Sequence, residues 1–298
     1  MDFLKEIVKE IGNDFTQLAS DIDETETYVD TGSYIFNGLI SGSIFGGVSN
    51  NKITAIAGES STGKTFFSLA VVKNFLDSNP DGYCLYFDTE AAVNKSLLSS
   101  RGIDLDRLVV VNVVTIEEFR TKALKAVDIY LKTNIEDRKP CMFVLDSLGM
   151  LSTEKEIRDA LDDKQGRDMT KSQLVKGAFR MLTLKLGQAN IPLIVTNHTY
   201  DVIGNIVKAK THKSRISKEN KTVDIRLYYD ERGLDKYYGL LELGEIGGLW
   251  KNVAGRYEIN GKKIYAKQIY AEPETYFDQY VMQALDEIAK KEFSYGES

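Results

Sequence analysis

Cysteine and long apolar runs are scarce in this sequence of 298 residues, and their scarcity excludes several classes of protein. The only two cysteines, Cys84 and Cys141, lie in predicted buried strands and indicate small core residues in a reducing compartment. No apolar run is long enough to cross a bilayer, and the first residues lack the basic start and long apolar stretch of a secretion signal. We therefore expect a cytoplasmic protein that has no membrane partner.

Positive charge is not in excess either. The 38 lysine and arginine residues are outnumbered by 44 aspartate and glutamate residues, which gives a net charge of −6. The chain therefore has no basic field over its whole surface, and any contact with nucleic acid must come from a local patch. A hydrophobic content of 43% and a charged content of 28% are ordinary for a soluble globular protein of one or two domains.

The clearest motif of the sequence is a phosphate loop of the form G-x-x-x-x-G-K-[ST]. It comprises Gly58, Glu59, Ser60, Ser61, Thr62, Gly63, Lys64 and Thr65. A short apolar run, 53–57, precedes it, and residues 66–76 follow as a predicted helix, which gives the strand, loop and helix that the motif needs. The alternative is a glycine- and serine-rich turn that binds nothing, and this context argues against it.

Each fixed position of the loop has a chemical use. Gly58 and Gly63 allow the backbone to turn so that successive N–H groups point at phosphate oxygens. The N-terminus of the following helix adds positive potential. Lys64 is expected to reach the β and γ phosphates, and the hydroxyl of Thr65 is expected to hold Mg²⁺. The motif therefore predicts a nucleotide bound together with Mg²⁺.

Predicted strands and helices alternate from residue 52 onward. The further strands are 83–87, 108–114, 141–145 and 191–196, and the helices include 115–132 and 170–188, with capping boxes expected at Thr115 with Glu118 and at Thr170 with Gln173. Such runs, separated by helices, predict an α/β fold with a mostly parallel central sheet that helices cover on both faces. Ligands of these sheets bind at the carboxyl ends of the strands, where Gly58, Glu90, Asp146 and His198 all fall.

Three of these strand-end residues are candidates for chemistry, and each has a plainer alternative. Asp146 can hold Mg²⁺ beside Thr65, directly or through water, or it can simply start a turn. Glu90 can orient and deprotonate an attacking water, or it can be a solvated loop glutamate. His198 can touch the γ-phosphate and report its loss, or it can be a structural histidine.

The chain divides into three predicted parts. Residues 1–48 combine an amphipathic helix with a linker, and this helix packs either on its own domain or, for oligomerisation, on a neighbouring subunit. Residues 49–234 form the α/β core, which includes a basic stretch over 207–221 and a strand over 223–229. Residues 235–298 have short glycine- and tyrosine-rich runs and a final amphipathic helix, and they predict a small C-terminal α+β domain.

Four motifs together resemble those of RecA-type recombinases, most closely the phage UvsX branch. They are Gly58–Thr65, Phe87-Asp88-Thr89-Glu90, Val144-Leu145-Asp146-Ser147-Leu148-Gly149 and Asn197-His198-Thr199-Tyr200. The resemblance extends from residue 31 to about residue 261 and so covers most of the chain. It implies a RecA-like phosphate-loop NTPase, which is a DNA-dependent ATPase that uses ATP and Mg²⁺.

The resemblance also implies a function and partners. The chain would form a helical filament, a homo-oligomer, on single-stranded DNA and promote homologous pairing and strand exchange in DNA recombination, repair and replication. Single-strand-binding and recombination-mediator proteins would be further partners. If a phage encodes the chain, the filament would work in the cytoplasm of a bacterial host.

Several residue roles follow from the resemblance. Glu90 matches the general base, and His198 matches the sensor of the γ-phosphate. Lys213 and Arg215 match the basic residues that reach the ATP of the neighbouring subunit; the alternative is a solvated basic strand. Residues 152–168 match the first mobile DNA-binding loop. The candidate DNA contacts on this loop and the next helix, which are otherwise plain surface charges, are Arg167, Lys171, Lys176 and Arg180.

Two departures from the family pattern bear on the expected function. Leu97 stands where the family has an aromatic residue that stacks on adenine. Between Tyr200 and Lys213 there is no Gly-Gly-Gly segment, so the second DNA-binding loop and a following sheet strand are missing. The alternative function is therefore an assembly or modulator protein that binds nucleotide but has lost strand exchange. A ring-forming RecA-fold motor and, more remotely, a small-molecule kinase are further alternatives.

Overall fold

A computed structural model of the chain describes residues 2–11, 16, 18, 20, 27–59, 62–162, 170–198, 206–228, 230–259 and 261–295. Three predicted site residues lie outside this part of the chain: Ser60 and Ser61 of the phosphate loop, and Arg167. The side chain of His198 also lies outside it, whereas the backbone of His198 is described.

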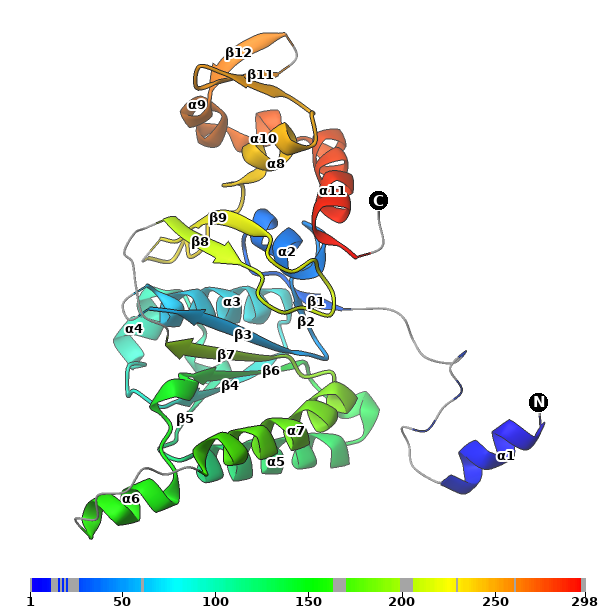
Figure 1. The fold of residues 1–298 in the computed structure, drawn as a ribbon, viewed down its shortest axis with the longest axis vertical. Coiled ribbons are helices and arrows are strands. Elements are labelled where there is room, and N and C mark those ends of the chain that lie inside the picture. Colours follow the sequence, from blue (N-terminus) through cyan, green and yellow to red (C-terminus); the bar gives the residue numbers. More distant parts are fainter. Residues whose placement is uncertain are drawn as a thin grey trace.

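Five parallel strands form the centre of the fold (Figure 1). In their order across the sheet they are β3 (Ile53–Gly58), β7 (Leu193–His198), β6 (Cys141–Asp146), β4 (Tyr83–Asp88) and β5 (Leu108–Asn112). The predicted fold class, an α/β fold with a parallel sheet, is confirmed. The strand predicted from residue 191 begins only at residue 193, because Pro192 has no N–H to donate to a neighbouring strand.

Helices cover both faces of this sheet. They are α3 (Lys64–Ser78), α4 (Lys95–Ser100), α5 (Ile116–Lys132) and α7 (Lys171–Ala189). One face packs against α3 and buries Cys84 and Tyr86, whereas the other packs against α5 and α7 and buries Phe87 and Cys141. Neighbouring residues of a strand point to opposite faces, so both faces of β4 and β6 belong to the core. Both cysteines are buried with free thiols, which confirms their prediction as core residues.

The predicted helix caps are confirmed only in part. Thr115 accepts a hydrogen bond from the N–H of Glu118 at the start of α5, but the Glu118 carboxylate accepts from the N–H of Val114 rather than from Thr115. At the start of α7, the side chain of Thr170 makes no capping hydrogen bond, so the capping box predicted there is wrong. The backbone of Thr170 is already helical, whereas a capping residue needs an extended backbone to turn its side chain toward the helix.

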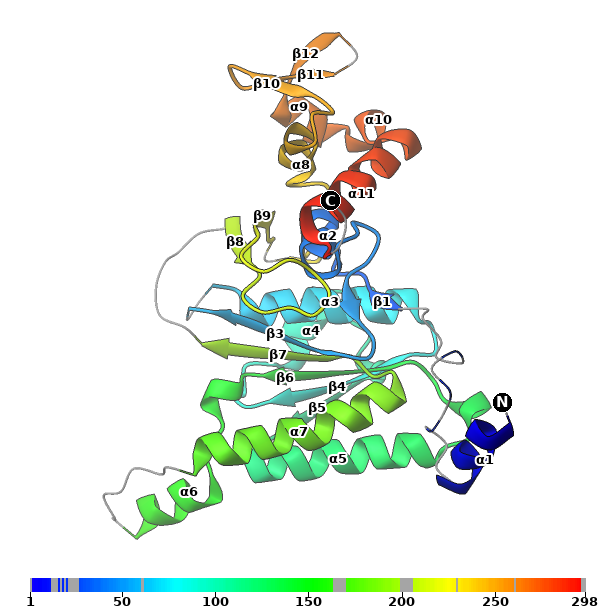
Figure 2. The same ribbon diagram turned by 45° about the vertical axis from the view of Figure 1, so that its right-hand side comes forward.

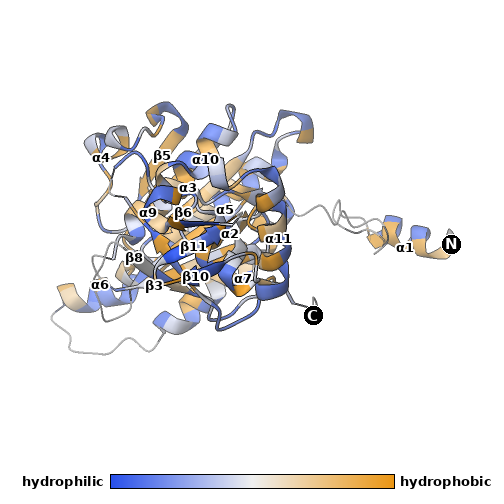
Figure 3. Cartoon of the chain, turned by 90° about the horizontal axis from the view of Figure 1, so that it is seen from above, coloured by the Kyte–Doolittle hydropathy of each residue, from blue (hydrophilic) through white to orange (hydrophobic). Residues whose placement is uncertain are grey.

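The N-terminal helix α1 (Asp2–Ile11) stands apart from the sheet (Figures 1 and 3). Its apolar side chains are exposed: Phe3 by 71%, Leu4 by 55% and Ile11 by 59%. Within a single chain, the amphipathic helix therefore does not bury its apolar face. No helix in the described part of the chain is long and apolar enough to cross a membrane. Three short elements follow α1, namely β1 (Tyr28–Val29), α2 (Tyr34–Ser41) and β2 (Val48–Ser49).

The segment predicted as the first mobile DNA-binding loop contains a helix, α6 (Glu154–Leu161). A capping box starts this helix, because Thr153 and Glu156 exchange hydrogen bonds between their side chains and backbone N–H groups. Figure 2 shows α6 extending beyond the end of α7 and away from the sheet. Residues 163–168 of the predicted loop lie outside the described part of the chain.

An antiparallel pair of strands, β8 (Ile206–Lys210) and β9 (Thr222–Arg226), comes after the parallel sheet. The sequence predicts β9 but not β8, because the lysines of β8 are unfavourable in strands and give it the pattern of a solvated basic stretch. Among the described residues, β8 pairs with β9 alone and adds no strand to the parallel sheet.

The C-terminal region mixes helices with a small antiparallel sheet. Its elements are α8 (Leu240–Ile246), β10 (Lys251–Val253), β11 (Arg256–Ile259), β12 (Lys262–Tyr265), α9 (Ala266–Ala271), α10 (Pro273–Tyr276) and α11 (Gln279–Phe293). The carboxylate of Asp286 in α11 accepts hydrogen bonds from the hydroxyl of Ser43 and the N–H of Ile44, which hold this region against the segment after α2. The predicted α+β character is confirmed, and the domain boundaries at residues 48/49 and 234/235 stay predictions.

Candidate nucleotide-binding site

The carboxyl ends of β3, β4, β6 and β7 lie at one edge of the parallel sheet (Figure 1). The register of the strands pairs Gly58 with His198 and Asp88 with Asp146. Because parallel strands all end on the same side, this edge gathers the strand ends at which the sequence predicts a ligand.

The phosphate loop joins β3 to α3 at this edge. Gly63 has φ of +83°, a left-handed conformation that glycine adopts without steric cost, and α3 begins directly after it. The hydroxyl of Thr62 donates to the carbonyl oxygen of Glu59 at 2.9 Å, and this hydrogen bond brings Thr62 close to Glu59. The first N–H groups of a helix have no acceptor within it, and this loop and helix start can therefore bind an anion.

Lys64 is almost enclosed by this loop, with 8% of its surface exposed. Its Nζ donates to the carbonyl oxygens of Gly58, at 2.9 Å, and of Glu59, at 2.5 Å. Burial lowers the pKa of Lys64 below its ordinary value, and the nearby Asp146 and Glu90 carboxylates oppose this shift. An ammonium group held by two carbonyl oxygens can exchange them for phosphate oxygens, which form stronger charge-assisted hydrogen bonds.

Asp146 is buried at the end of β6, and three hydroxyl groups donate to its carboxylate. Oδ2 accepts from Thr65 at 2.6 Å and from Tyr86 at 2.7 Å, and Oδ1 accepts from Thr196. The pKa of Tyr86 is raised well above its ordinary value by burial and by the Asp146 carboxylate, so its hydroxyl keeps the proton that it donates. Four secondary-structure elements thus meet at one carboxylate: α3, β4, β6 and β7.

Thr65 and Asp146 form a donor set that suits Mg²⁺. A hydroxyl oxygen and a carboxylate oxygen lie 2.6 Å apart at the start of α3 and the end of β6. Magnesium prefers such hard oxygens and takes further ligands from water and substrate phosphates. The part of the chain that the structure describes has no group of three or more His, Cys, Asp or Glu side chains that could hold a metal alone. Thr65 and Asp146 would thus supply part of the coordination of a cation at this edge.

Glu90 is exposed in the turn after β4, and two contacts fix its position. Its N–H donates to Oδ1 of the buried Asp88 at 3.0 Å, and its Oε1 accepts from the hydroxyl of Ser147 at 2.7 Å. The hydroxyl of Thr89 also contacts the backbone of Ser147, and the N–H of Thr89 donates to the carbonyl oxygen of Asp146. These bonds join the turns after β4 and β6, so they place Glu90 beside the turn that follows Asp146.

Two other predicted nucleotide contacts, Lys213 and Arg215, are not brought to this edge by any contact described within the single chain. Lys213 and Arg215 are exposed on the connection between β8 and β9, and no hydrogen bond or ion pair described for them reaches the phosphate loop. Leu97 is partly buried in α4 and packs against the core. The backbone of His198 lies next to Gly58 in the sheet, and the role of its side chain stays a prediction.

The candidate DNA contacts with described positions lie on α7. Lys176 and Arg180 are exposed and four residues apart, so they lie on the same side of the helix. Lys171 is half-buried, and its Nζ lies 3.9 Å from the carboxylate of Glu156 in α6. The exposed pair on α7 is therefore more open to a polyanion than Lys171 is.

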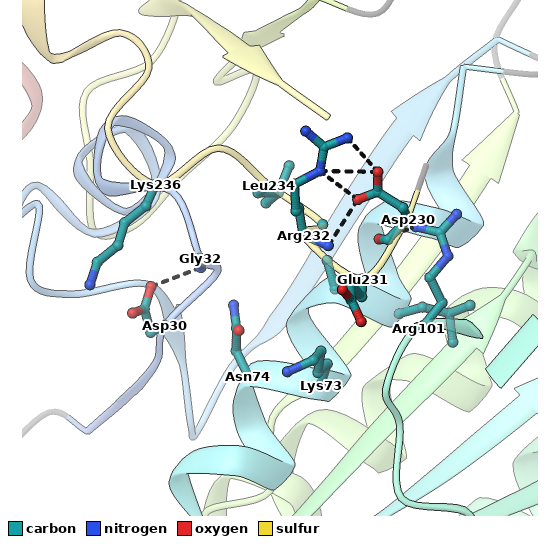
Figure 4. Close-up of a pocket in the computed structure, with 13 residues that line it drawn as sticks. Asp30, Gly32, Lys73, Asn74, Arg101, Asp230, Glu231, Arg232, Leu234 and Lys236 are labelled. Carbon is teal, nitrogen blue, oxygen red and sulfur yellow. Dashed lines mark hydrogen bonds and ion pairs between the residues drawn. The ribbon is translucent and has the colours of Figure 1, made fainter. Parts of the chain in front are cut away.

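A separate polar pocket of about 250 Å³ is lined by the middle of α3 and by residues 230–236 rather than by the phosphate loop (Figure 4). Some of its charges are paired within the chain. Arg232 forms an ion pair with Asp230, and Lys73 forms one with Asp77 at 2.5 Å. Arg101 donates to the backbone carbonyl of Asp230 at 2.9 Å. Its lining carries four basic and three acidic side chains, so opposite charges nearly balance and do not single out a phosphate as its ligand.

No motif predicts the contacts of Tyr86 and Thr196 with Asp146. The available signal is that each is a hydroxyl residue inside an otherwise apolar strand, where a buried polar group needs a partner. The identity of that partner depends on which strands are neighbours and in which register, and this information is not local in the sequence.

The parallel sheet, the phosphate loop at its carboxyl edge and the paired Thr65 and Asp146 define a phosphate-loop α/β protein with a RecA-like fold. Comparison with known families identifies the group within this class. The RecA N-terminal domain family matches residues 2–214. The chain therefore belongs to the RecA family, which confirms the resemblance predicted from its four motifs.

Individual relatives agree with this assignment. The chain is 30% identical over 260 residues to the "Recombination and repair protein" of Enterobacteria phage T4, across 75% of this chain and 65% of the T4 protein. It is 26% identical over 201 residues to "Protein RecA" of Malacoplasma penetrans, across 67% of this chain and 56% of that protein. It is 24% identical over 258 residues to "Protein RecA" of Cereibacter sphaeroides (strain ATCC 17023), across 74% of this chain and 71% of that protein. The chain thus spans less than two thirds of the length of the first two relatives.

Proposed function

We propose that this chain is an ATP-dependent DNA recombinase that forms filaments on single-stranded DNA and promotes homologous pairing and strand exchange. Membership of the RecA family and the similarity to a phage recombination and repair protein support this proposal. The observation that carries it is that four predicted site residues meet at one edge of the sheet. Thr65 is hydrogen bonded to Asp146, and Glu90 is hydrogen bonded to Ser147, the residue after Asp146. The charges of Asp146 and Glu90 both act on Lys64.

The proposed reaction is hydrolysis of ATP to ADP and phosphate. The backbone N–H groups of the phosphate loop and the N-terminus of α3 would cradle the phosphates. Lys64 would leave the carbonyl oxygens of Gly58 and Glu59 and bind the β and γ phosphates, where its charge opposes the charge that develops during transfer. Mg²⁺ held by Thr65 and Asp146 would supply further charge neutralisation on the phosphates.

Glu90 would act as the general base. A water molecule would attack the γ-phosphorus, Glu90 would take a proton from that water, and the bond from the γ-phosphorus to the β–γ bridging oxygen would break. The hydrogen bond from Ser147 to Oε1 would help to orient the carboxylate toward the water. His198, whose backbone lies beside Gly58, would sense the γ-phosphate and its loss.

Assembly would complete this site from a second copy of the chain. The exposed apolar face of α1 favours packing on a neighbouring subunit, since this face is not buried within its own chain. Lys213 and Arg215 are likewise exposed, and we propose that they reach the ATP of the neighbouring subunit. A positive charge supplied in this way would stabilise the transferring phosphoryl group and make hydrolysis depend on assembly.

Single-stranded DNA would bind along α6 and α7. The exposed Lys176 and Arg180 are the contacts that the geometry favours most, and Lys171 and Arg167 complete the proposed set. Contacts with phosphates release counterions and give affinity for any sequence.

The second candidate is a nucleotide-binding assembly or modulator protein that has lost strand exchange. A specific observation favours it: β7 ends at residue 198 and β8 begins at residue 206, so only a short connection stands where the family has its second DNA-binding loop. Such a protein would bind ATP and assemble, but it would not couple ATP hydrolysis to DNA.

Measurement of ATP hydrolysis with and without single-stranded DNA at low salt separates the two candidates. Strong stimulation by DNA is expected of a recombinase, because the first DNA-binding segment and the subunit interface then suffice to connect DNA to the ATP site. Hydrolysis at the same rate with and without DNA would favour the modulator. The Lys64→Ala variant is the control for ATPase activity from other proteins in the preparation.

A further inference from the structure

Tyr86 lies fully buried in β4, on the face of the sheet that α3 covers, and its hydroxyl contacts the end of β6. In the register of the sheet, Tyr86 pairs with Val144, and Asp146 lies two residues further along β6 on the same face. A long aromatic side chain reaches such a diagonal neighbour. The hydroxyl lies 2.7 Å from Oδ2 of Asp146 and 3.1 Å from Oγ of Ser68 in α3.

The direction of these hydrogen bonds follows from counting protons. A carboxylate only accepts, so the one hydroxyl proton of Tyr86 goes to Asp146. The single hydroxyl proton of Ser68 is shared by two acceptors, the oxygen of Tyr86 at 3.1 Å and the carbonyl oxygen of Thr65 at 2.9 Å. A chain of hydroxyl groups therefore runs from α3 through Tyr86 to the carboxylate.

The three residues whose hydroxyls donate to Asp146 differ in burial and in the element that carries them. Tyr86 and Thr196 are fully buried and belong to the strands on either side of β6. Thr65 is only half-buried and belongs to the phosphate loop, which must receive the ligand. Tyr86 and Thr196, which both belong to the sheet, therefore hold the two carboxylate oxygens of Asp146 in place. The hydroxyl of Thr65 then donates to a carboxylate whose orientation is already set.

We propose that Tyr86 is a positioning residue for the Mg²⁺ of this site, because its hydroxyl holds Asp146 in the orientation that aligns Thr65. The proposal rests on the proposed nucleotide site and deepens it. It concerns a fully buried group that is not among the proposed ligands of the nucleotide or the metal. Partners of this kind are important in metal sites, where their removal typically costs about 10- to 100-fold in metal affinity.

The test uses Tyr86→Phe, which removes the hydroxyl and keeps the ring that fills the core. Binding of a fluorescent ADP derivative is measured at increasing Mg²⁺ concentration and again in EDTA. The half-saturating Mg²⁺ concentration is expected to rise by about 10- to 100-fold, while binding in EDTA stays at the wild-type value. Tyr83→Phe is the matched control on the same strand, because the Tyr83 hydroxyl contacts Cys141 instead, and it is expected to leave the Mg²⁺ dependence unchanged.

A wild-type Mg²⁺ dependence in Tyr86→Phe would overturn the proposal, and so would an equal loss of binding with Mg²⁺ and in EDTA, which a merely structural role predicts. If Tyr86→Phe does not fold, Ser68→Ala provides the test, since it removes the partner that holds the oxygen of Tyr86. Its half-saturating Mg²⁺ concentration is then expected to rise several-fold, and an unchanged value would overturn the proposal. Absence of nucleotide binding by the wild-type chain would instead overturn the proposed function.

Discussion

At the carboxyl edge of the sheet, Lys64, Asp146 and Thr196 are buried and hydrogen bonded within the chain, whereas Lys176 and Arg180 on α7 are exposed to solvent. The same contrast separates the phosphate loop from Lys213 and Arg215 between β8 and β9. The first region is the proposed site of the nucleotide and the cation, and its groups are already held in place by hydrogen bonds. The second region consists of lysine and arginine side chains that are exposed on the surface of the single chain.

The two regions differ in how far their side chains are ordered before a ligand binds. Buried groups that are held by their neighbours are already oriented for a ligand, so little order must be created on binding. Exposed lysine and arginine side chains become ordered only against a partner, which here would be DNA or a second subunit. Nucleotide binding and DNA binding should therefore respond to different mutations and to different conditions.

The largest effect is expected from Lys64→Ala, in the buried region. Loss of the ammonium removes the positive charge opposite the β and γ phosphates, and ATP hydrolysis measured by phosphate release is expected to fall about 10³-fold. Lys73→Ala is the matched control on the same helix, because its charge is paired with Asp77 outside the phosphate loop. An unchanged rate of hydrolysis in Lys64→Ala would contradict the proposal that Lys64 and the phosphate loop bind the ATP that is hydrolysed.

A smaller and more selective effect is expected from Glu90→Gln. The amide keeps the shape of the side chain but cannot take a proton from water, so the turnover rate is expected to fall about 10²-fold. ATP binding, measured separately by titration, should be retained because Lys64 and Thr65 are unchanged. If turnover were normal, Glu90 would be the solvated loop residue of the plainer interpretation.

The smallest effect is expected from the double variant Lys176→Ala with Arg180→Ala, in the exposed region. The slope of log affinity for single-stranded DNA against log salt concentration is expected to become shallower by about 1.4, at about 0.7 for each DNA phosphate that the variant no longer neutralises. Lys185→Ala is the control on the same helix, because Lys185 is ion paired with Asp128 of α5. An unchanged slope would show that DNA binds elsewhere, and altered nucleotide binding in this variant would contradict the separation of the two regions.

Local patterns predict much of the fold. The uninterrupted apolar runs predict the strands of the parallel sheet, and their ends agree with the structure to within about two residues. The pattern fails at β8, where lysines alternate with apolar residues, and at Thr170, whose helical backbone removes the expected cap. In both places the surrounding tertiary structure outweighs the local preference of the residues.

The phosphate loop, the strand that precedes it, the helix that follows it and the carboxylates at neighbouring strand ends could all be predicted from the sequence. Each of these is encoded by residues that are close together in the chain. The hydrogen bonds of Tyr86, Thr196 and Thr65 with the carboxylate of Asp146, and that of Ser147 with Glu90, become evident only in the folded chain. These contacts depend on the order β3-β7-β6-β4-β5 and on the strand register. Burial of the whole sheet selects that order and register, and no short segment of the sequence does so alone.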